Sequence, residues 1–249
     1  MKTIIANWKM YLGVRESVAL SRGVLRGLRG MKTIPEVILA PSYPALGEVS
    51  KILSRSRVRL SAQNMSHQDH GAYTGDVSSR MLKELGVNAV ILGHSERRAK
   101  GMVDSDVHLK LVRAVAEGID PIVCVGEPSA THEAGETEGY VHEQINTIFE
   151  GVETNKRSTI YVAYEPLWAI GSGKTPSIHD VETVHAMIRE QLSELGIDKV
   201  SVLYGGSVDP ENAYEFLNNS EVDGVLIGGA GVRIQKLLDI ITVASEIKA

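Results

Sequence analysis

Short apolar runs alternate along the chain with longer segments whose apolar residues recur every three or four positions. The short runs are rich in β-branched residues and show little internal alternation, which is typical of parallel strands covered on both faces. Alternation of such runs with helical segments is the pattern of repeated strand–helix units. Eight runs predict strands, at Thr3–Asn7, Val37–Ala40, Val58–Ala62, Ala89–Leu92, Ile122–Val125, Ile160–Tyr164, Val200–Leu203 and Gly224–Ile227.

The clearest predicted helix has apolar residues at helical spacing over Val181–Leu195. Ser177 and Asp180 have the spacing of a capping box in front of it, and Gly196 ends it. Asp209-Pro210 predicts a second helix start, since an N-cap acceptor is followed there by proline at the first helical position.

Eight strand–helix units in a chain of 249 residues average about 31 residues each, which is the spacing of a (β/α)8 barrel. No proline-rich, serine-rich or single-sign stretch marks a linker. The prediction is therefore an α/β fold, a single-domain (β/α)8 TIM barrel in which residues 1–249 form one catalytic domain. A doubly wound open sheet is the structural alternative, since periodicity does not show that a sheet closes.

Composition narrows the class of protein. The chain has 43% apolar residues and a net charge of −5, and this mild acidity disfavours a nucleic-acid partner. Its single cysteine, Cys124, permits no intramolecular disulfide and suits a reducing compartment. The first apolar run stops at Asn7, too early for a signal peptide, and no stretch reaches the roughly 18 apolar residues of a membrane helix. We therefore expect a cytoplasmic protein with no membrane partner.

Polar residues and glycine pairs follow five of the predicted strands. In a barrel, the carboxyl ends of all strands meet at the face where reactive groups belong. Taken singly, Lys9 reads as a solvated lysine, His94 as a structural histidine and Glu165 as a helix-start acid. Their common location instead predicts a catalytic site. The segments are Asn7-Trp8-Lys9, Gly93-His94-Ser95-Glu96-Arg97-Arg98, Tyr164-Glu165-Pro166, Gly205-Gly206-Ser207 and Gly228-Gly229-Ala230-Gly231.

The glycine turns after the last two predicted strands indicate a phosphate site, since glycine lets backbone N–H groups approach an anion closely. Gly171–Thr175 ends like a nucleotide-binding P-loop, but Trp168 stands where that motif requires glycine, which excludes this interpretation. Asp104, Asp106 and His108 could be read as metal ligands. Acids at a helix start are the simpler interpretation, and we expect no metal.

Three irregular segments are long enough to be functional or mobile: His67–Gly75, Glu127–Glu136 and Pro166–Pro176. Glu127 directly follows the fifth predicted strand, so it could itself react. We interpret it as a support for neighbouring site residues.

Four segments carry a family resemblance, and they occur in order from the first predicted strand to the seventh. Together with the glycine turn after the eighth, they resemble the signature segments of the triosephosphate isomerase family over essentially the whole chain. They are Asn7-Trp8-Lys9-Met10, the Gly93–Arg98 segment, Ala163-Tyr164-Glu165-Pro166-Leu167-Trp168-Ala169-Ile170-Gly171-Ser172-Gly173-Lys174-Thr175, and Tyr204-Gly205-Gly206-Ser207-Val208.

The resemblance implies reversible interconversion of dihydroxyacetone phosphate and D-glyceraldehyde 3-phosphate through an enediolate, in glycolysis and gluconeogenesis and without metal or organic cofactor. Glu165 corresponds to the family's general base and His94 to its electrophile. Lys9 corresponds to the electrostatic stabiliser, Asn7 to a second substrate-binding group, and Glu96 to a carboxylate that supports the site.

The resemblance also implies phosphate contacts, a lid and an assembly. Pro166–Pro176 corresponds to a closing lid, and the loop His67–Asp76 is similar to one through which the family forms homodimers. The phosphate contacts correspond to Gly171, Ser207, Gly228 and Gly229.

Three positions depart from the family pattern. Tyr11 stands where asparagine or histidine is common, Asp104 replaces glutamate, and Gly231 replaces a serine. The effect of these departures stays open at the level of sequence. Two functional alternatives also remain: another phosphosugar isomerase on a phosphate-binding barrel, and a catalytically inactive phosphate-binding protein.

Overall fold

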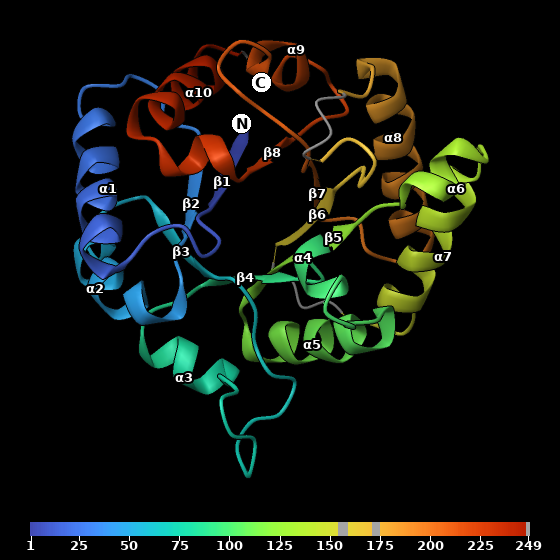
Figure 1. Ribbon diagram of the computed structural model, residues 1–249, viewed down its shortest axis with the longest axis horizontal. Coiled ribbons are helices and arrows are strands. Elements are labelled where there is room, and N and C mark those ends of the chain that lie inside the picture. Colours follow the sequence, from blue (N-terminus) through green and yellow to red (C-terminus); the bar gives the residue numbers. More distant parts are fainter. Residues whose placement is uncertain (154–158, 171–174, 248–249) are drawn as a thin grey trace.

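Eight parallel strands close into a barrel in a computed structural model that describes residues 1–153, 159–170 and 175–247. The strands follow their sequence order around the barrel, and the eighth pairs with the first. Helices surround the barrel on its outside (Figure 1). The predicted (β/α)8 TIM barrel is confirmed, and its closure excludes the open doubly wound sheet.

The observed strands agree closely with the predicted ones. Four have the predicted bounds, and the other four differ by one or two residues at an end. The largest difference is in β5, where pairing with β4 begins at Asp120, before Pro121. The strands are β1 Thr3–Asn7, β2 Glu36–Ala40, β3 Arg59–Ala62, β4 Ala89–Leu92, β5 Asp120–Val125, β6 Ile160–Tyr164, β7 Val200–Tyr204 and β8 Gly224–Ile227.

The helices vary in length from one turn to more than four. The short helix η1, Gly229–Val232, follows β8 directly and precedes the last long helix. The α-helices are α1 Val14–Gly27, α2 Tyr43–Leu53, α3 Ser79–Glu84, α4 Ser95–Arg98, α5 Asp104–Glu117, α6 Ser129–Glu133, α7 Thr137–Phe149, α8 Ile178–Glu194, α9 Ala213–Leu217 and α10 Ile234–Glu246.

One predicted helix start is confirmed and another is wrong. At α8, the Ser177 hydroxyl accepts the Asp180 N–H at 3.1 Å, and the Asp180 carboxylate accepts the Ser177 N–H at 3.2 Å, so the capping box forms. By contrast, α9 begins at Ala213, after a turn, and not at Pro210. The Asp209 carboxylate forms an ion pair with Lys236 at 2.7 Å and does not cap a helix.

The barrel has two apolar cores. One lies inside the barrel and includes Ile5, Ile91 and Leu226, and the other lies between the strands and the surrounding helices. Cys124 belongs to the inner core and is fully buried as a free thiol. Burial raises the pKa of this thiol, and the nearby Glu165 carboxylate raises it further.

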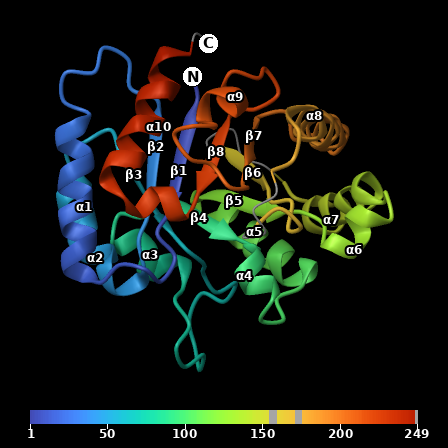
Figure 2. The same ribbon diagram turned by 45° about the horizontal axis from the view of Figure 1, so that its top comes forward.

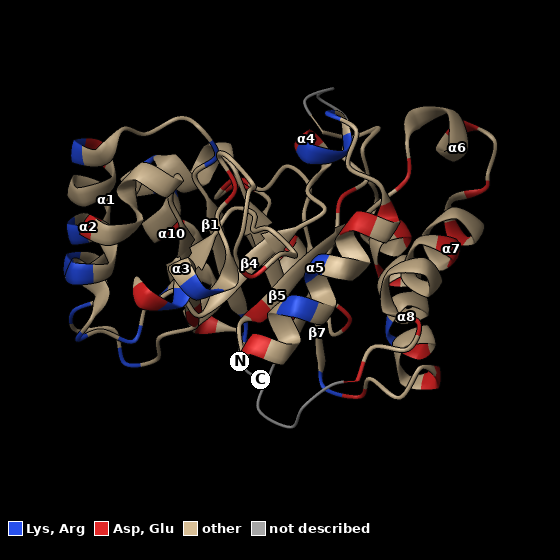
Figure 3. Cartoon of the chain, turned by 90° about the horizontal axis from the view of Figure 1, so that it is seen from below, with Lys and Arg blue, Asp and Glu red and all other residues tan. Residues whose placement is uncertain are grey.

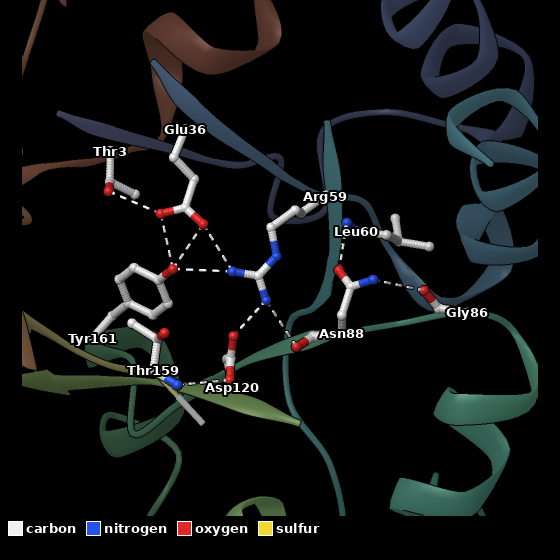
Figure 4. A network of polar contacts seen from close by, with 9 residues as sticks. All are labelled: Thr3, Glu36, Arg59, Leu60, Gly86, Asn88, Asp120, Thr159 and Tyr161. Carbon is white, nitrogen blue, oxygen red and sulfur yellow. Dashed lines mark hydrogen bonds and ion pairs between the residues drawn. The ribbon is translucent and has the colours of Figure 1, made fainter. Parts of the chain in front are cut away.

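A charged network closes the barrel at the starts of its strands (Figure 4). The Arg59 guanidinium donates to a carboxylate oxygen of Glu36 at 2.8 Å and to the Tyr161 hydroxyl at 3.0 Å, and it also pairs with Asp120. Burial lowers the pKa of Arg59, but its hydrogen bonds to the two carboxylates outweigh that effect and raise it. The carboxyl ends of the strands, at the opposite end of the barrel, remain open for a site.

Charge is unevenly distributed around the barrel. Figure 3 shows basic residues gathered on α1, whereas acidic residues gather on α7 and α8. The first 60 residues contain 11 Lys and Arg but only 3 Asp and Glu, although the whole chain is acidic. No helix within the described ranges has the length and apolarity needed to cross a membrane.

Candidate active site

A cavity of about 440 Å³ lies at the carboxyl ends of the strands. Lys9 reaches it from the segment after β1, His94 from the segment after β4 and Glu165 from the segment after β6. The structure thus brings together the cation, the imidazole and the carboxylate that sequence analysis placed at one end of the barrel. Asn7, Ser207, Gly228 and Gly229 line the same cavity.

His94 is held in a defined tautomer and faces Glu165. It caps the one-turn helix α4, and its Nδ1 accepts the backbone N–H of Glu96 at 3.2 Å. An N–H group donates only to an unprotonated ring nitrogen, so the proton of the neutral ring lies on Nε2. That Nε2 is 3.2 Å from Glu165 Oε1. The ring therefore presents a hydrogen-bond donor to the cavity.

Glu165 is almost completely buried, and both of its carboxylate oxygens have neighbours. Oε2 accepts the Ser95 N–H at 3.0 Å, while Oε1 faces His94. Two glycines leave room for this residue. A Cβ at Gly205 would lie 2.8 Å from Glu165 Cγ, and a Cβ at Gly126 would lie 1.8 Å from its carbonyl oxygen. Gly205, expected to cradle phosphate, also makes space for the carboxylate, and sequence analysis did not identify Gly126.

Lys9 has an unusual backbone. Its φ of +48° is the one positive value at a non-glycine residue in the described part of the chain. Two side chains hold this conformation: Asn7 Oδ1 accepts the Lys9 N–H at 3.0 Å, and Gln63 Nε2 donates to its carbonyl at 2.8 Å. Such strain persists where surrounding contacts over-determine it, commonly at functional sites. The contacts fix the direction in which the lysine leaves β1.

The Lys9 ammonium forms an ion pair with Glu96 at 2.8 Å. Partial burial would raise the pKa of Glu96, but the hydrogen bond and charge of Lys9 outweigh it and lower that pKa. A Cβ at Gly228 would lie 3.0 Å from Lys9 Cε, so the lysine side chain also passes close to the segment after β8. Lys9 therefore links the His94 side of the cavity to its glycine-rich side.

The glycine-rich side is formed by the segments after β7 and β8. Nothing lies within 4 Å of a Cβ added at Gly229, so its backbone borders open space at the start of η1. At Gly231, by contrast, a Cβ would lie 3.2 Å from that of Ala6, which explains why a small residue suits this departure from the family pattern. Gly171, the fourth expected phosphate contact, and residues 172–174 of the expected lid lie outside the described residues.

Glu127 supports the segment that follows β6. Its buried Oε1 accepts hydrogen bonds from Trp168 Nε1 at 2.7 Å, from the Tyr164 hydroxyl at 3.1 Å and from Thr137 Oγ1 at 3.2 Å. His132 stacks on the Trp168 ring with their centroids 3.9 Å apart. Glu127 does not line the cavity, and these contacts agree with its interpretation as a support.

The residues considered as metal ligands are engaged separately. Arg98 pairs with Asp104, Asp106 accepts the Val103 N–H at 3.2 Å, and His108 Nδ1 lies 2.9 Å from the Ile148 carbonyl. Among the described residues, no three His, Cys, Asp or Glu side chains are grouped to hold a metal ion.

Sequence analysis missed two cations of the cavity, Arg233 and Lys236. Both follow the glycine-rich turn Gly228–Gly231, and that position was the available signal: residues just beyond a phosphate-type turn are within reach of its ligand. Tyr11, identified as a departure from the family pattern, lines the cavity mouth and is largely exposed.

Comparisons with known proteins agree with this geometry. The model of the triosephosphate isomerase family matches residues 2–244. The chain is 40% identical to the triosephosphate isomerase of Chlorobium phaeobacteroides (strain BS1), with 98% of each chain covered, and 41% identical to that of Alkaliphilus metalliredigens (strain QYMF), covering 96% of this chain and 98% of the relative. The crystal structure of triosephosphate isomerase from Bartonella henselae superposes with a TM-score of 0.85 at 34% identity, covering 97% of this chain and 98% of the other.

Proposed function

Because the chain belongs to the triosephosphate isomerase family, we propose that it interconverts dihydroxyacetone phosphate and D-glyceraldehyde 3-phosphate through an enediolate. One observation carries the assignment of residues: Lys9, His94 and Glu165, which come from three different strands, line one cavity. The set contains a base, a hydrogen-bond donor and a cation, which are the groups needed to move a proton between two carbons beside an oxyanion.

Glu165 is the proposed general base. It removes a proton from the carbon beside the carbonyl and returns it to the neighbouring carbon, so one carboxylate serves both directions. Its contact with the Ser95 N–H holds the carboxylate until substrate replaces that contact. The almost complete burial of Glu165 supports the assignment, because a carboxylate shielded from water is a more effective base.

His94 is the proposed electrophile, and Lys9 is the proposed electrostatic stabiliser. The His94 Nε2–H polarises the carbonyl oxygen and passes a proton between the two oxygens of the enediolate. Lys9 offsets the negative charge that develops there, and a single preorganised donor of this kind is worth about 3 kcal/mol in the transition state. Asn7 and Glu96 position Lys9 through its backbone and its ammonium group, and Asn7 also contacts substrate.

The phosphate is proposed to bind at Ser207, Gly228 and Gly229, with Gly171 contributing from the lid Pro166–Pro176. Exposed backbone N–H groups and the start of η1 suit a dianion. The lid keeps water from an enediolate that would otherwise eliminate phosphate. Support for the lid comes from Trp168, which Glu127 holds at the base of this segment.

We further propose a homodimer through the loop His67–Asp76. This loop protrudes from the barrel between β3 and α3 (Figure 2), and Tyr73 on it is 47% exposed. Light scattering should give the mass of two chains, and deletion of residues 70–74 should give one chain with reduced activity. A fully active monomer would contradict the assembly.

We also propose that residues 1–249 act as one catalytic domain of glycolysis and gluconeogenesis in the cytoplasm. The free buried thiol of Cys124 fits that compartment. The net charge of −5 supports a protein without a nucleic-acid partner, and the proposed chemistry uses side chains and backbone groups of the protein alone.

The decisive experiment measures turnover of D-glyceraldehyde 3-phosphate in a coupled assay. Glu165→Gln should abolish turnover, and Glu165→Asp should lower kcat about 100-fold with little change in KM, because it withdraws the carboxylate by about 1 Å. Binding of phosphate without turnover would favour the inactive phosphate-binding protein. Preference for a longer sugar phosphate would favour another phosphosugar isomerase.

A further inference from the structure

The charged residues of the cavity are not equally available to an anionic ligand. Lys9 is paired with Glu96, and Lys236 is paired with Asp209 at 2.7 Å. In each pair the neighbouring carboxylate already offsets the positive charge. A dianion that approaches either lysine must compete with this carboxylate or approach a pair with little net charge.

Arg233 differs from these lysines. It lines the same cavity, its side chain is exposed, and the described part of the chain offers it neither a carboxylate partner nor a side-chain hydrogen bond. It is thus the one unpaired cation among the described cavity residues. All the donor groups of its guanidinium are free for a ligand.

The backbone of Arg233 is fixed, although its side chain is free. Its N–H donates to the carbonyl of Ala230 in η1 at 3.2 Å, and its own carbonyl accepts the N–H of Leu237 in α10 at 2.9 Å. It therefore lies at the junction of two helices, four residues beyond Gly229. From this junction Arg233 lines the same cavity as Ser207, Gly228 and Gly229.

We propose that Arg233 recognises the phosphate group of the substrate and selects phosphorylated trioses over unphosphorylated ones. The inference rests on the proposed function and adds a side-chain contact to the backbone cradle. A guanidinium binds phosphate oxygens in pairs, and its charge draws a dianion to the cavity mouth. Arg233 closely follows the proposed phosphate contacts Gly228 and Gly229 in the chain. It therefore acts on the binding and capture of substrate, and the proton transfers stay with Glu165 and His94.

The test is Arg233→Gln, with Arg26→Gln on α1 as the matched control. Arg26 is likewise exposed and has no carboxylate partner among the described residues, but it lies outside the cavity, so it reproduces the change in net charge alone. For glyceraldehyde 3-phosphate, Arg233→Gln should raise KM about 5- to 10-fold and change kcat by less than about 2-fold. The salt dependence of kcat/KM should weaken, and Arg233→Lys should recover part of the loss because it restores charge without the paired donors.

Two further measurements separate phosphate recognition from general damage. Slow turnover of D-glyceraldehyde, which lacks the phosphate, should be the same in Arg233→Gln as in the parent. Inorganic phosphate, titrated by ³¹P NMR, should bind about 5- to 10-fold more weakly to Arg233→Gln but unchanged to the control. Unchanged KM together with unchanged phosphate affinity would overturn the proposal, as would an equal loss of turnover on both substrates. A parent protein that binds phosphate through Arg233 but does not isomerise triose phosphate would refute the proposed function alone.

Discussion

Individual residues show where the chain accepts an unfavourable local state. The positive φ of Lys9 costs about 1–3 kcal/mol. Asn7 Oδ1, which accepts the Lys9 N–H, and Gln63 Nε2, which donates to the Lys9 carbonyl, hold this conformation, so part of the role expected for Asn7 is to position its neighbour. Lys9 could be predicted as a site residue because it closely follows β1. Its strained backbone and its contact with Gln63 could not be predicted, because Gln63 is 54 residues away in the sequence.

His185 on α8 is a buried titratable residue that does not line the proposed active-site cavity. Its Nδ1 lies 3.0 Å from the carbonyl of Glu221, Nε2 has no hydrogen-bond partner in the described structure, and burial lowers its pKa from 6.5 to about 4. Protonation therefore favours the unfolded chain between these two values. The contribution of neutral His185 to the free energy of unfolding is fully present above pH 6.5 and should be lost as the pH falls toward 4.

We expect this histidine alone to remove about 2 kcal/mol from the free energy of unfolding between pH 7.5 and pH 5.0. His185→Gln keeps a donor for the Glu221 carbonyl but does not titrate, so its stability should vary correspondingly less over this range. Urea unfolding of both proteins at the two pH values measures the difference. Identical pH dependence would show that His185 does not contribute.

At the scale of elements, local signals predicted those features that depend on nearby residues. The capping box of Ser177 and Asp180 joins groups three residues apart, and it forms as expected. The start of α9 was misplaced because Asp209 has a partner, Lys236, on a different helix. The same limit applies to Gly126 and Gly205, since their closeness to Glu165 arises only when β5, β6 and β7 lie side by side.

Gly224 allows β8 to close the barrel against β1. A Cβ added there would lie 2.0 Å from the carbonyl oxygen of Thr3. The clash cannot be relieved by moving β1 and β8 apart, because their pairing closes the barrel. We therefore expect Gly224→Ala to lower the free energy of unfolding by about 3 kcal/mol or more.

Gly139→Ala is the matched control, because Gly139 lies in α7 and nothing is within 4 Å of its added Cβ. This change should raise stability by about 0.5 kcal/mol, since alanine favours helix more than glycine does. Chemical denaturation of the two variants compares them directly. Equal effects of the two alanines would show that the contact with Thr3 relaxes easily.

For the molecule as a whole, the two ends of the barrel carry different polar groups. The carboxyl ends of the strands hold the cavity, and their starts hold the ion network of Arg59, Glu36 and Asp120. Sequence analysis predicted the cavity because polar residues follow several strands, and these strand ends meet at one face of a barrel. It did not predict the ion network, since its three residues belong to β2, β3 and β5 and meet only because the barrel closes.

This separation predicts that stability and catalysis can be changed independently. Arg59→Met should lower the free energy of unfolding by about 3 kcal/mol, because it leaves Glu36 and Asp120 as poorly compensated, partly buried charges. Lys51→Met, which breaks only the exposed pair with Glu48, should change stability little. At temperatures where each variant is folded, kcat/KM should equal that of the parent. If Arg59→Met lowered kcat/KM while the protein remained fully folded, the two ends of the barrel would be coupled, and the network would have to be counted among the groups that shape the site.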